Sequence, residues 1–282
     1  MFHKLWSRVN RASSPFQVLS DLHLEVNRQY ASYDFPVCAK QLILAGDIGR
    51  LADYDDYRDF LQKQTDRFEL VFLVLGNHEF YNDTFTEGVE RARQLEQESC
   101  FNGRLILLHQ RRYDIPESNV TVLGCTLWSD VPSEAQDIVR SKIQDFRKIE
   151  GWTVNDHNAS HESDLAWLLK EIQSTQRENG CAKTQPHERS VLVVTHHAPS
   201  LQRTSSPQHA ESPWKFAFAT EILSQVSRET NIKVWVFGHT HYTTEFTEGN
   251  IKVVSNQRGY VLPWSDPKVA KDEFDARKVI HV

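Results

Sequence analysis

The sequence predicts an α/β fold with a metal site at one edge of its sheets. Apolar runs of strand length alternate with segments of helical periodicity, which is the pattern of a layered α/β domain. Several of these runs stop abruptly at polar residues, and the run at 70–75 is followed by Gly76-Asn77-His78-Glu79. Because the carboxyl ends of parallel strands lie at the same edge of a sheet, we expect these polar side chains to lie close together.

The first half of the chain supplies most of the expected strands. Asp21 and His23 follow the first strand, and alternate side chains of an extended segment share a face, so this pair is expected to point the same way. The second strand ends at Gly46-Asp47, where glycine allows close approach of the backbone. Strands are expected at 16–19, 41–45, 70–75, 105–108 and 120–124, and helices at 53–68 and 84–98.

Residues 129–188 break this alternation. Two helix-like stretches, at 134–149 and 163–176, are expected to form a helical, cap-like insertion beside the site. We expect His157 and His161 to be surface or helix-capping groups rather than metal ligands, because no strand end presents them. The core then resumes with strands at 190–195, 233–237 and 251–255 and a helix at 213–230.

The composition narrows the function classes. The chain has 282 residues and a formal net charge of -6, so it offers no global basic field for nucleic acid or a membrane surface. Its four cysteines are widely spaced, which favours a reducing compartment over a disulfide framework. No apolar run reaches the roughly 20 residues of a membrane-spanning helix. No repeat or Gly/Ser-rich linker divides the chain, so residues 1–282 are expected to form one domain.

These features favour a cytoplasmic protein that does not bind membranes. A mitochondrial location is the alternative, because residues 1–11 lack acidic groups and are mildly amphipathic, as transit peptides are. The sequence gives no oligomeric state.

Five polar blocks stand at the expected strand ends. Burying so many polar groups at one sheet edge costs free energy unless they have partners, and packing alone gives no reason for it. Carboxylates and imidazoles are metal ligands, so the blocks outline a metal site. The adjacent residues His196 and His197 leave their strand on opposite sides, so at most one is expected to face a metal ion. The blocks are Asp21-Leu22-His23, Gly46-Asp47, Gly76-Asn77-His78-Glu79, Thr195-His196-His197 and Gly238-His239-Thr240-His241.

In content and order, these blocks resemble the calcineurin-like metallophosphoesterase superfamily, whose pattern is Asp-x-His, Gly-Asp, Gly-Asn-His-Glu/Asp, a lone His and Gly-His-x-His. The resemblance implies a four-layer α/β/β/α sandwich with a binuclear centre of Mn, Fe or Zn at the carboxyl ends of the strands. It also implies that Asp47 bridges the two ions and that His196, not His197, is a ligand. The implied ligands are Asp21, His23, Asp47 and His241 for one ion and Asp47, Asn77, His196 and His239 for the other.

The same resemblance gives other residues their expected roles. His78 is implied as the general acid for the leaving group or as a donor to the phosphoryl oxygen. Glu79 would orient a neighbouring ligand or cap the following turn. Arg50, Arg258 and Tyr260 are candidates for substrate contact, although a surface ion pair suits Arg50 equally well, because the Gly-Asp-x-x-Asp-Arg-Gly motif of protein phosphatases is absent. Residues 127–130, 146–149, 195–200 and 256–260 resemble a subgroup of uncharacterised microbial and fungal phosphoesterases, in which Pro is typical where Gln257 stands.

The expected function is hydrolysis of a phosphoester by a hydroxide that bridges the two ions. A phosphodiester of a small, nucleotide-like substrate is favoured over a monoester, because the protein-phosphatase motif is absent and the short chain resembles cyclic-nucleotide phosphodiesterases. A nuclease acting at the same site would carry a basic groove, which the net charge disfavours. A non-catalytic, protein-binding scaffold would have lost metal ligands, and none is lost.

Overall fold

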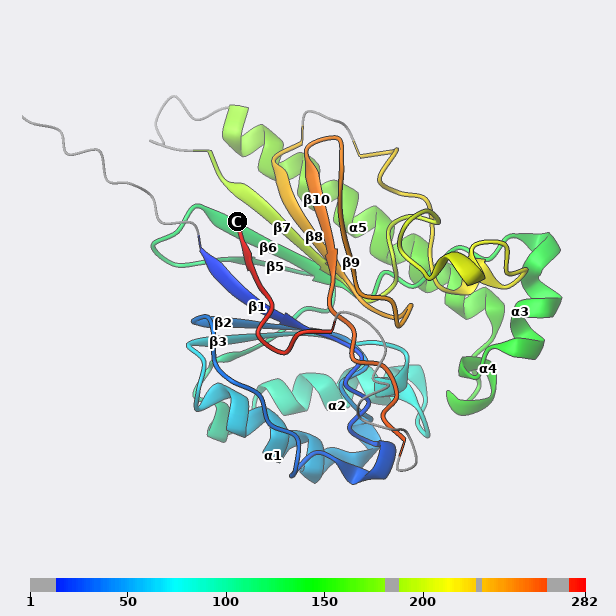
Figure 1. The fold of residues 1–282 in the computed structure, drawn as a ribbon, viewed down its shortest axis with the longest axis horizontal. Coiled ribbons are helices and arrows are strands. Elements are labelled where there is room, and N and C mark those ends of the chain that lie inside the picture. Colours follow the sequence, from blue (N-terminus) through cyan, green and yellow to red (C-terminus); the bar gives the residue numbers. More distant parts are fainter. Residues whose placement is uncertain (1–13, 181–187, 227–229, 263–273) are drawn as a thin grey trace, which may run out of the picture.

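The structure, a computed structural model, describes residues 14–180, 188–226, 230–262 and 274–282. Two β-sheets lie face to face at its centre (Figure 1). Among the described residues, one sheet has five strands in the order β11-β1-β2-β3-β4, and the other has six in the order β5-β6-β7-β8-β10-β9. The strands are β1 Pro15–Leu19, β2 Gln41–Ala45, β3 Leu70–Val74, β4 Leu105–Leu107, β5 Arg111–Asp114, β6 Val120–Cys125, β7 Ser190–Thr195, β8 Ile232–Phe237, β9 Thr244–Glu248, β10 Ile251–Ser255 and β11 Val279–His281.

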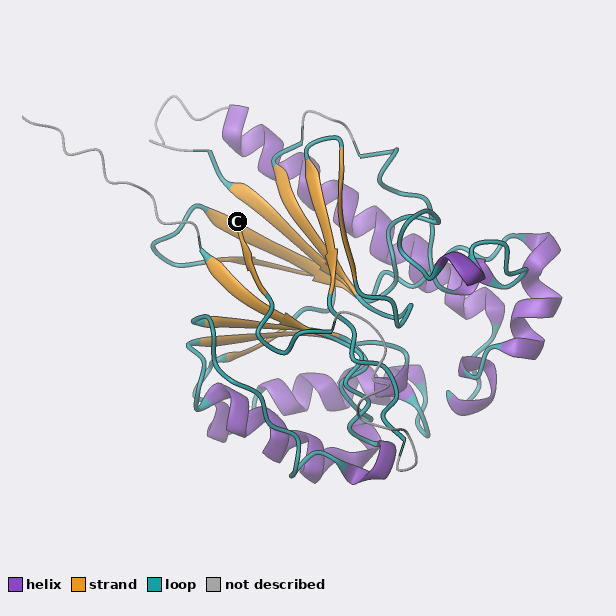
Figure 2. Ribbon diagram, in the orientation of Figure 1, coloured by secondary structure: helices purple, strands orange, loops and turns teal. Residues whose placement is uncertain are grey.

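Helices cover the outer faces of both sheets (Figure 2). Helices α1 (Tyr54–Thr65) and α2 (Phe85–Glu96) pack against the five-stranded sheet, and α5 (Val154–Gly180) packs against the six-stranded sheet. The result is the four-layer α/β/β/α sandwich that the sequence predicted, and that prediction is confirmed.

The central strands carry apolar side chains on both faces of the sheet. In β2, Ile43 lies in the cluster between the two sheets, whereas Leu42 and Leu44 pack toward α1 and α2. The parallel register pairs Val18 with Ile43, and Ile43 with Phe72. A slip of one residue would exchange the two buried faces, so the register is tightly specified. The carboxyl ends of the strands are therefore held level with one another at one edge of each sheet.

The predicted helix at 213–230 is wrong. Among its described residues, only Lys215–Ala217 forms a short helical turn. Ala198 and Ala219 form a parallel β-bridge, and the Ala198 N–H donates to the carbonyl oxygen of Phe218. This pairing fixes residues 218–220 beside the end of β7, so tertiary contacts override the helical spacing of the apolar residues in this segment.

The structure divides the predicted insertion at 129–188 into two parts. Helices α3 (Gln136–Lys142) and α4 (Asp145–Lys148) lie beyond the carboxyl ends of the strands (Figure 1). They replace one predicted helix with two, because Ile143 between them adopts an extended conformation. Helix α5, which contains the other predicted helix, begins at Val154 and forms an outer layer of the sandwich.

Three strands that the apolar pattern did not indicate, β5, β9 and β11, lie at sheet edges. An edge strand need not carry apolar side chains on both faces, and the side chains of β9 are mostly exposed. Residues 1–11, with their transit-like pattern, lie outside the described residues, as do 181–187 of the insertion and 227–229 of the predicted helix. Among the described helices, none combines the length and the apolar character that crossing a bilayer requires.

Candidate metal centre

Polar side chains from the loops that follow β1, β2, β7 and β8 converge at one edge of the sandwich. They include two groups of candidate ligands in which the potential donor atoms lie within 4.8 Å of one another, and a third such group among the described residues, His23, Glu25 and His78, lies beside the first. Asp47 belongs to both groups, so it lies between two candidate metal positions. The first group is Asp21, His23, Asp47 and His241, and the second is Asp47, His196 and His239.

Two glycines give these side chains the space they need. Gly46 has a φ of 88°, and a Cβ atom there would lie 2.3 Å from His196 Nδ1. At Gly76, a Cβ atom would lie 2.2 Å from Asp47 Oδ1. Atoms cannot approach so closely, so a side chain at either position would displace the imidazole or the shared carboxylate.

Five of the candidate ligands adopt a left-handed backbone conformation, which is uncommon for residues other than glycine. Such conformations cost about 1 to 3 kcal/mol each and cluster at functional sites. The turns after the strands therefore bend these side chains toward one another at some expense in stability. The φ angles are 52° at Asp21, 47° at His23, 53° at Asp47, 71° at His239 and 49° at His241.

Hydrogen bonds set which nitrogen of each imidazole faces the centre. His196 Nδ1 lies 2.9 Å from the carbonyl oxygen of Ala45, so it carries the proton and leaves Nε2 free, 3.4 Å from Asp47 Oδ1. His23 Nδ1 lies 3.2 Å from Glu25 Oε1, and His23 Nε2 lies 2.9 Å from His241 Nε2. A carboxylate or carbonyl behind each ring is the usual support for a metal-binding histidine.

Asn77 presents its amide oxygen to the same space. Its Nδ2 donates to Asp145 Oδ1 at 2.7 Å, and Oδ1 therefore points the other way, 3.1 Å from His196 Nε2. Tyr81 OH also donates to Asp145 Oδ1, at 2.7 Å. Burial raises the pKa of Asp145, whereas these two hydrogen bonds oppose the rise. Asp145, at the start of α4, thus fixes the orientation of an amide at the edge of the metal centre.

Glu79 ties two of these loops together. Its carboxylate accepts backbone N–H groups of Asp47 at 2.9 Å, Ile48 at 2.8 Å and Gly76 at 2.7 Å, and it accepts the hydroxyl of Tyr57 at 3.0 Å. Of the two roles that the sequence left open for Glu79, orienting a neighbouring ligand accounts for these contacts. It holds the loop after β2 against the loop after β3.

His78 lies next to the two groups and faces the cavity. Its Nδ1 lies 2.8 Å from Glu25 Oε1, and its Nε2 lies 2.9 Å from Tyr260 OH. Burial lowers the pKa of His78, but the carboxylates of Asp47 and Glu25 outweigh this effect and raise it to about 9. The two carboxylates therefore favour the protonated form of this imidazole.

The electrostatics of the cluster fit metal cations. Burial, together with the nearby Asp47 carboxylate, raises the pKa of Asp21 to about 7, although His196 works against the rise. Burial also disfavours the charged form of Asp47, but the surrounding imidazoles hold its pKa well below the usual range. Within the described residues, these carboxylates pair only with histidines, not with lysine or arginine. Metal ions would displace the shared protons and supply the missing positive charge.

Three other histidines pack around the centre. His197 is fully buried, and its ring lies 4.0 Å from that of His239 and 5.3 Å from that of Trp128. His157 and His161 were expected at the surface or at a helix cap, which is wrong, because both are buried where α5 packs on the core. In the described residues neither belongs to a metal-ligating group. His157 Nε2 contacts Ser129 Oγ at 2.9 Å, and His161 Nδ1 contacts the carbonyl oxygen of Leu127 at 2.9 Å.

The two candidate arginines lie away from the cavity that the centre opens into. Arg50 pairs with Asp53 at 2.9 Å. Arg258 donates to the carbonyl oxygen of Leu22 at 3.0 Å and to Gln29 Oε1 at 2.8 Å. Tyr260, in contrast, lines the cavity and is 49% exposed, with its ring 4.2 Å from that of His23.

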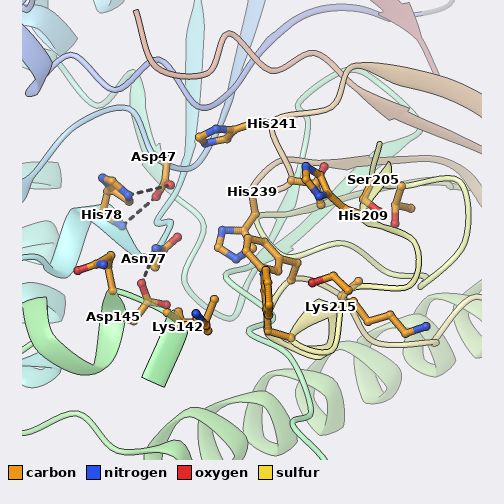
Figure 3. A pocket seen from close by; sticks show the side chains of 18 of the residues that line it. Asp47, Asn77, His78, Lys142, Asp145, Ser205, His209, Lys215, His239 and His241 are labelled. Carbon is orange, nitrogen blue, oxygen red and sulfur yellow. Dashed lines mark hydrogen bonds and ion pairs between the residues drawn. The ribbon is translucent and has the colours of Figure 1, made fainter. Parts of the chain in front are cut away.

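The cavity has a volume of about 430 Å³ (Figure 3). Asp47, His78, His239 and His241 line one end. Sequence reasoning missed two residues here, Glu25 and Asp145. Glu25 stands two residues after His23, as His23 does after Asp21, although their left-handed turns rather than the expected extended segment bring these side chains together; nothing local to Asp145 indicated its contact with Asn77.

Known proteins resemble this chain in sequence and fold. An uncharacterised protein of Acanthamoeba polyphaga mimivirus is 26% identical over 268 residues, covering 86% of this chain and 90% of that protein. Among solved structures, phosphopantetheinyl hydrolase from Mycobacterium tuberculosis is 20% identical, with a TM-score of 0.62, covering 93% of this chain and 99% of that chain. A dimetal phosphatase from Danio rerio is 13% identical, with a TM-score of 0.49, covering 87% of each chain.

The family model for calcineurin-like phosphoesterase matches residues 14–243, a span that contains every candidate metal ligand. The fold and the two ligand groups that share Asp47 agree with that match. The chain therefore belongs to the calcineurin-like phosphoesterase family and is a metal-dependent hydrolase of phosphoester bonds.

Proposed function

We propose that this enzyme cleaves a phosphodiester of a small, nucleotide-like substrate. The observation that carries the proposal is the pair of ligand groups sharing Asp47, with His78 beside them in the lining of one cavity. A phosphomonoester dianion carries a second negative charge, which arginine commonly neutralises. No arginine is among the described residues that line this cavity, and Arg50 and Arg258 are engaged elsewhere. This favours a diester monoanion.

Two metal ions fit the two groups. When bound, such ions activate water and stabilise the charge that develops on the phosphoryl oxygens. The mixture of imidazole, carboxylate and amide donors suits Mn, Fe or Zn. We propose Asp21, His23, Asp47 and His241 as ligands of one ion and Asp47, Asn77, His196 and His239 as ligands of the other.

His78 is the proposed proton donor to the leaving alkoxide. Its Nδ1–H donates to Glu25, so Nε2 is the atom that faces the cavity, where Tyr260 OH now contacts it at 2.9 Å. Tyr260 lies at the mouth of the site, and burial together with nearby carboxylates raises its pKa well above the usual range, so it stays a neutral phenol. A substrate oxygen would take the place of that phenol at His78 Nε2.

Glu25 is expected to position His78 and His23 without touching the substrate. Its Oε1 accepts from both rings, and these two hydrogen bonds, despite burial, lower the pKa of Glu25 to about 2. Glu25→Ala should lower kcat by about 10- to 100-fold with little change in KM, as loss of such supporting carboxylates does. Glu25→Gln keeps an acceptor oxygen and should restore most of the rate. Equal losses in both variants would contradict a positioning role.

The proposed function is tested with bis(para-nitrophenyl) phosphate and para-nitrophenyl phosphate, after the protein is loaded separately with Mn, Fe and Zn. The diester should be hydrolysed with a kcat/KM at least about 10-fold above that of the monoester. The reverse preference would identify a phosphomonoesterase. Hydrolysis of neither compound under any metal would contradict the proposal.

A further inference from the structure

The cavity extends beyond the metal centre to a second wall built from two segments outside the ligand loops. One segment is the junction of α3 and α4 and contributes Lys142, Ile143 and Gln144. The other runs from Leu201 to Ala219 and contributes aromatic, basic and hydroxyl side chains (Figure 3). The volume of about 430 Å³ is much larger than one phosphate group needs, and it falls within the range of pockets that hold organic ligands, about 300 to 1,000 Å³.

This second wall is packed as a unit. Val131, Ala135, Val139, Val154 and Ala217 form a small apolar core, and Ile143, Trp214 and Phe218 pack against it. The two segments therefore support each other across this core (Figure 1). A wall with its own core holds a fixed shape, which a specific binding surface requires.

Both segments are also attached to the metal centre. Asp145 at the start of α4 accepts the amide of Asn77 at 2.7 Å. The Phe218 ring stacks on His239 with 4.8 Å between centroids, and the Ala217 carbonyl oxygen lies 3.3 Å from His239 Nε2. The second wall is thus positioned relative to the same residues that are proposed to hold the reacting phosphoryl group.

The second wall combines apolar aromatic side chains with positively charged lysines. Trp214 and Phe218 offer aromatic surface, and Lys142 Nζ lies 5.8 Å from the centre of the Trp214 ring. Lys142 is exposed, and within the part of the chain that the structure describes it forms no ion pair. Lys215 pairs only loosely with Glu211, at 3.9 Å, and donates one hydrogen bond to the carbonyl oxygen of Ala210 at 3.1 Å, so its ammonium group keeps further donors. In a chain of net charge -6, two such lysines in the lining of one cavity are available for an anion.

We propose that this wall binds a part of the substrate that has a flat apolar body and carries a second anionic group, as in a nucleotide with a terminal phosphate. The reacting diester would lie at the ligand groups, the flat body against Trp214 and Phe218, and the second anion at Lys142 and Lys215. This inference rests on the proposed function, because it extends the same substrate into the same cavity.

The kinetic test compares the dinucleotide TpT with its phosphorylated form pTpT under metal-loaded conditions. The wild type should hydrolyse pTpT with a kcat/KM about 10-fold higher, mainly through KM, since a paired phosphate adds charge-assisted hydrogen bonds. The double variant Lys142→Ala/Lys215→Ala should lose this preference, and Lys142→Glu/Lys215→Glu should reverse it. Lys148→Ala, in α4 but outside the cavity, is the matched control and should keep the preference.

A binding test separates the wall from the hydrolysis. Thymidine bisphosphate (pTp) and thymidine monophosphate (pT) are titrated calorimetrically into the metal-loaded protein. The wild type should bind pTp about 10-fold more tightly than pT, and the double alanine variant should bind both equally. If no diester is hydrolysed but the wild type still binds pTp more tightly than pT, the proposed function is wrong, whereas the proposed anion site of the second wall is supported. If the wild type prefers neither pTpT nor pTp, or if the double alanine variant keeps the preference, the proposed second anion site is wrong.

Discussion

Asp47→Asn is expected to reduce bound metal from about two ions per chain to about one or fewer, and to lower kcat on the order of 1,000-fold. Asp47 is the only residue present in both ligand groups of the described structure. The substitution removes the negative charge that both ions would share and leaves a neutral amide of nearly the same shape. The measurements are metal content by mass spectrometry and hydrolysis of bis(para-nitrophenyl) phosphate.

The structure indicates why Asp47→Asn should still fold. Asp47 Oδ1 accepts the backbone N–H of His78 at 2.9 Å, and an amide oxygen can accept the same hydrogen bond. The Asp47 carboxylate also raises the pKa of both Asp21 and Glu79, although burial is the larger cause, so removing it relieves repulsion between buried acids. The imidazoles that hold the pKa of Asp47 well below the usual range lose this counter-charge in the variant, so after chelation it should still unfold cooperatively but at a lower temperature than the parent.

Asp53→Asn is the matched control. Asp53 follows the same strand, but its carboxylate pairs with Arg50 and lies in neither ligand group. This variant should keep parental metal content and rate. If Asp47→Asn matched it in both respects, the assignment of Asp47 as the shared ligand would be wrong.

His78→Ala is expected to keep both metal ions and to lower kcat by about 100- to 10,000-fold with TpT, whose leaving group is an alkoxide. A para-nitrophenolate leaving group needs little help from a proton, so the loss with bis(para-nitrophenyl) phosphate should be much smaller. Similar losses with both substrates would favour the other role that the sequence allows, donation to the phosphoryl oxygen. His281→Ala, in the last strand, serves as the control.

Parental rates with both substrates would show that His78 has no catalytic role. The geometry predicts otherwise, since its Nε2 faces the cavity while Nδ1 is held by Glu25. The carboxylates of Asp47 and Glu25 also raise the pKa of His78, which favours the protonated imidazole.

The sequence predicted the sheet core and its functional edge, because buried parallel strands leave an unambiguous apolar signal. Runs such as 41–45 are apolar on both faces, and Asp47 follows directly where the strand ends. The division of ligands between two ions came from the family resemblance, since spacing along the chain does not tell which loops meet in space.

The sequence predictions failed where tertiary contacts decide the structure. The segment after Trp214 has helical spacing, but it forms only a short helical turn at Lys215–Ala217 before Ala219 pairs with Ala198. Edge strands such as β9 carry polar residues and give no apolar run. Asp145 reaches Asn77 from a distant part of the chain, so its role depends on a fold that local patterns cannot specify.

Metal content tests the central claim of a shared binuclear centre most directly. The purified wild-type protein, loaded separately with Mn, Fe and Zn and then freed of unbound metal, is analysed for metal per chain alongside Asp47→Asn. The structure predicts about two ions per wild-type chain with at least one of these metals, and hydrolysis that rises with the second ion. Fewer than one ion per chain with all three metals would contradict it.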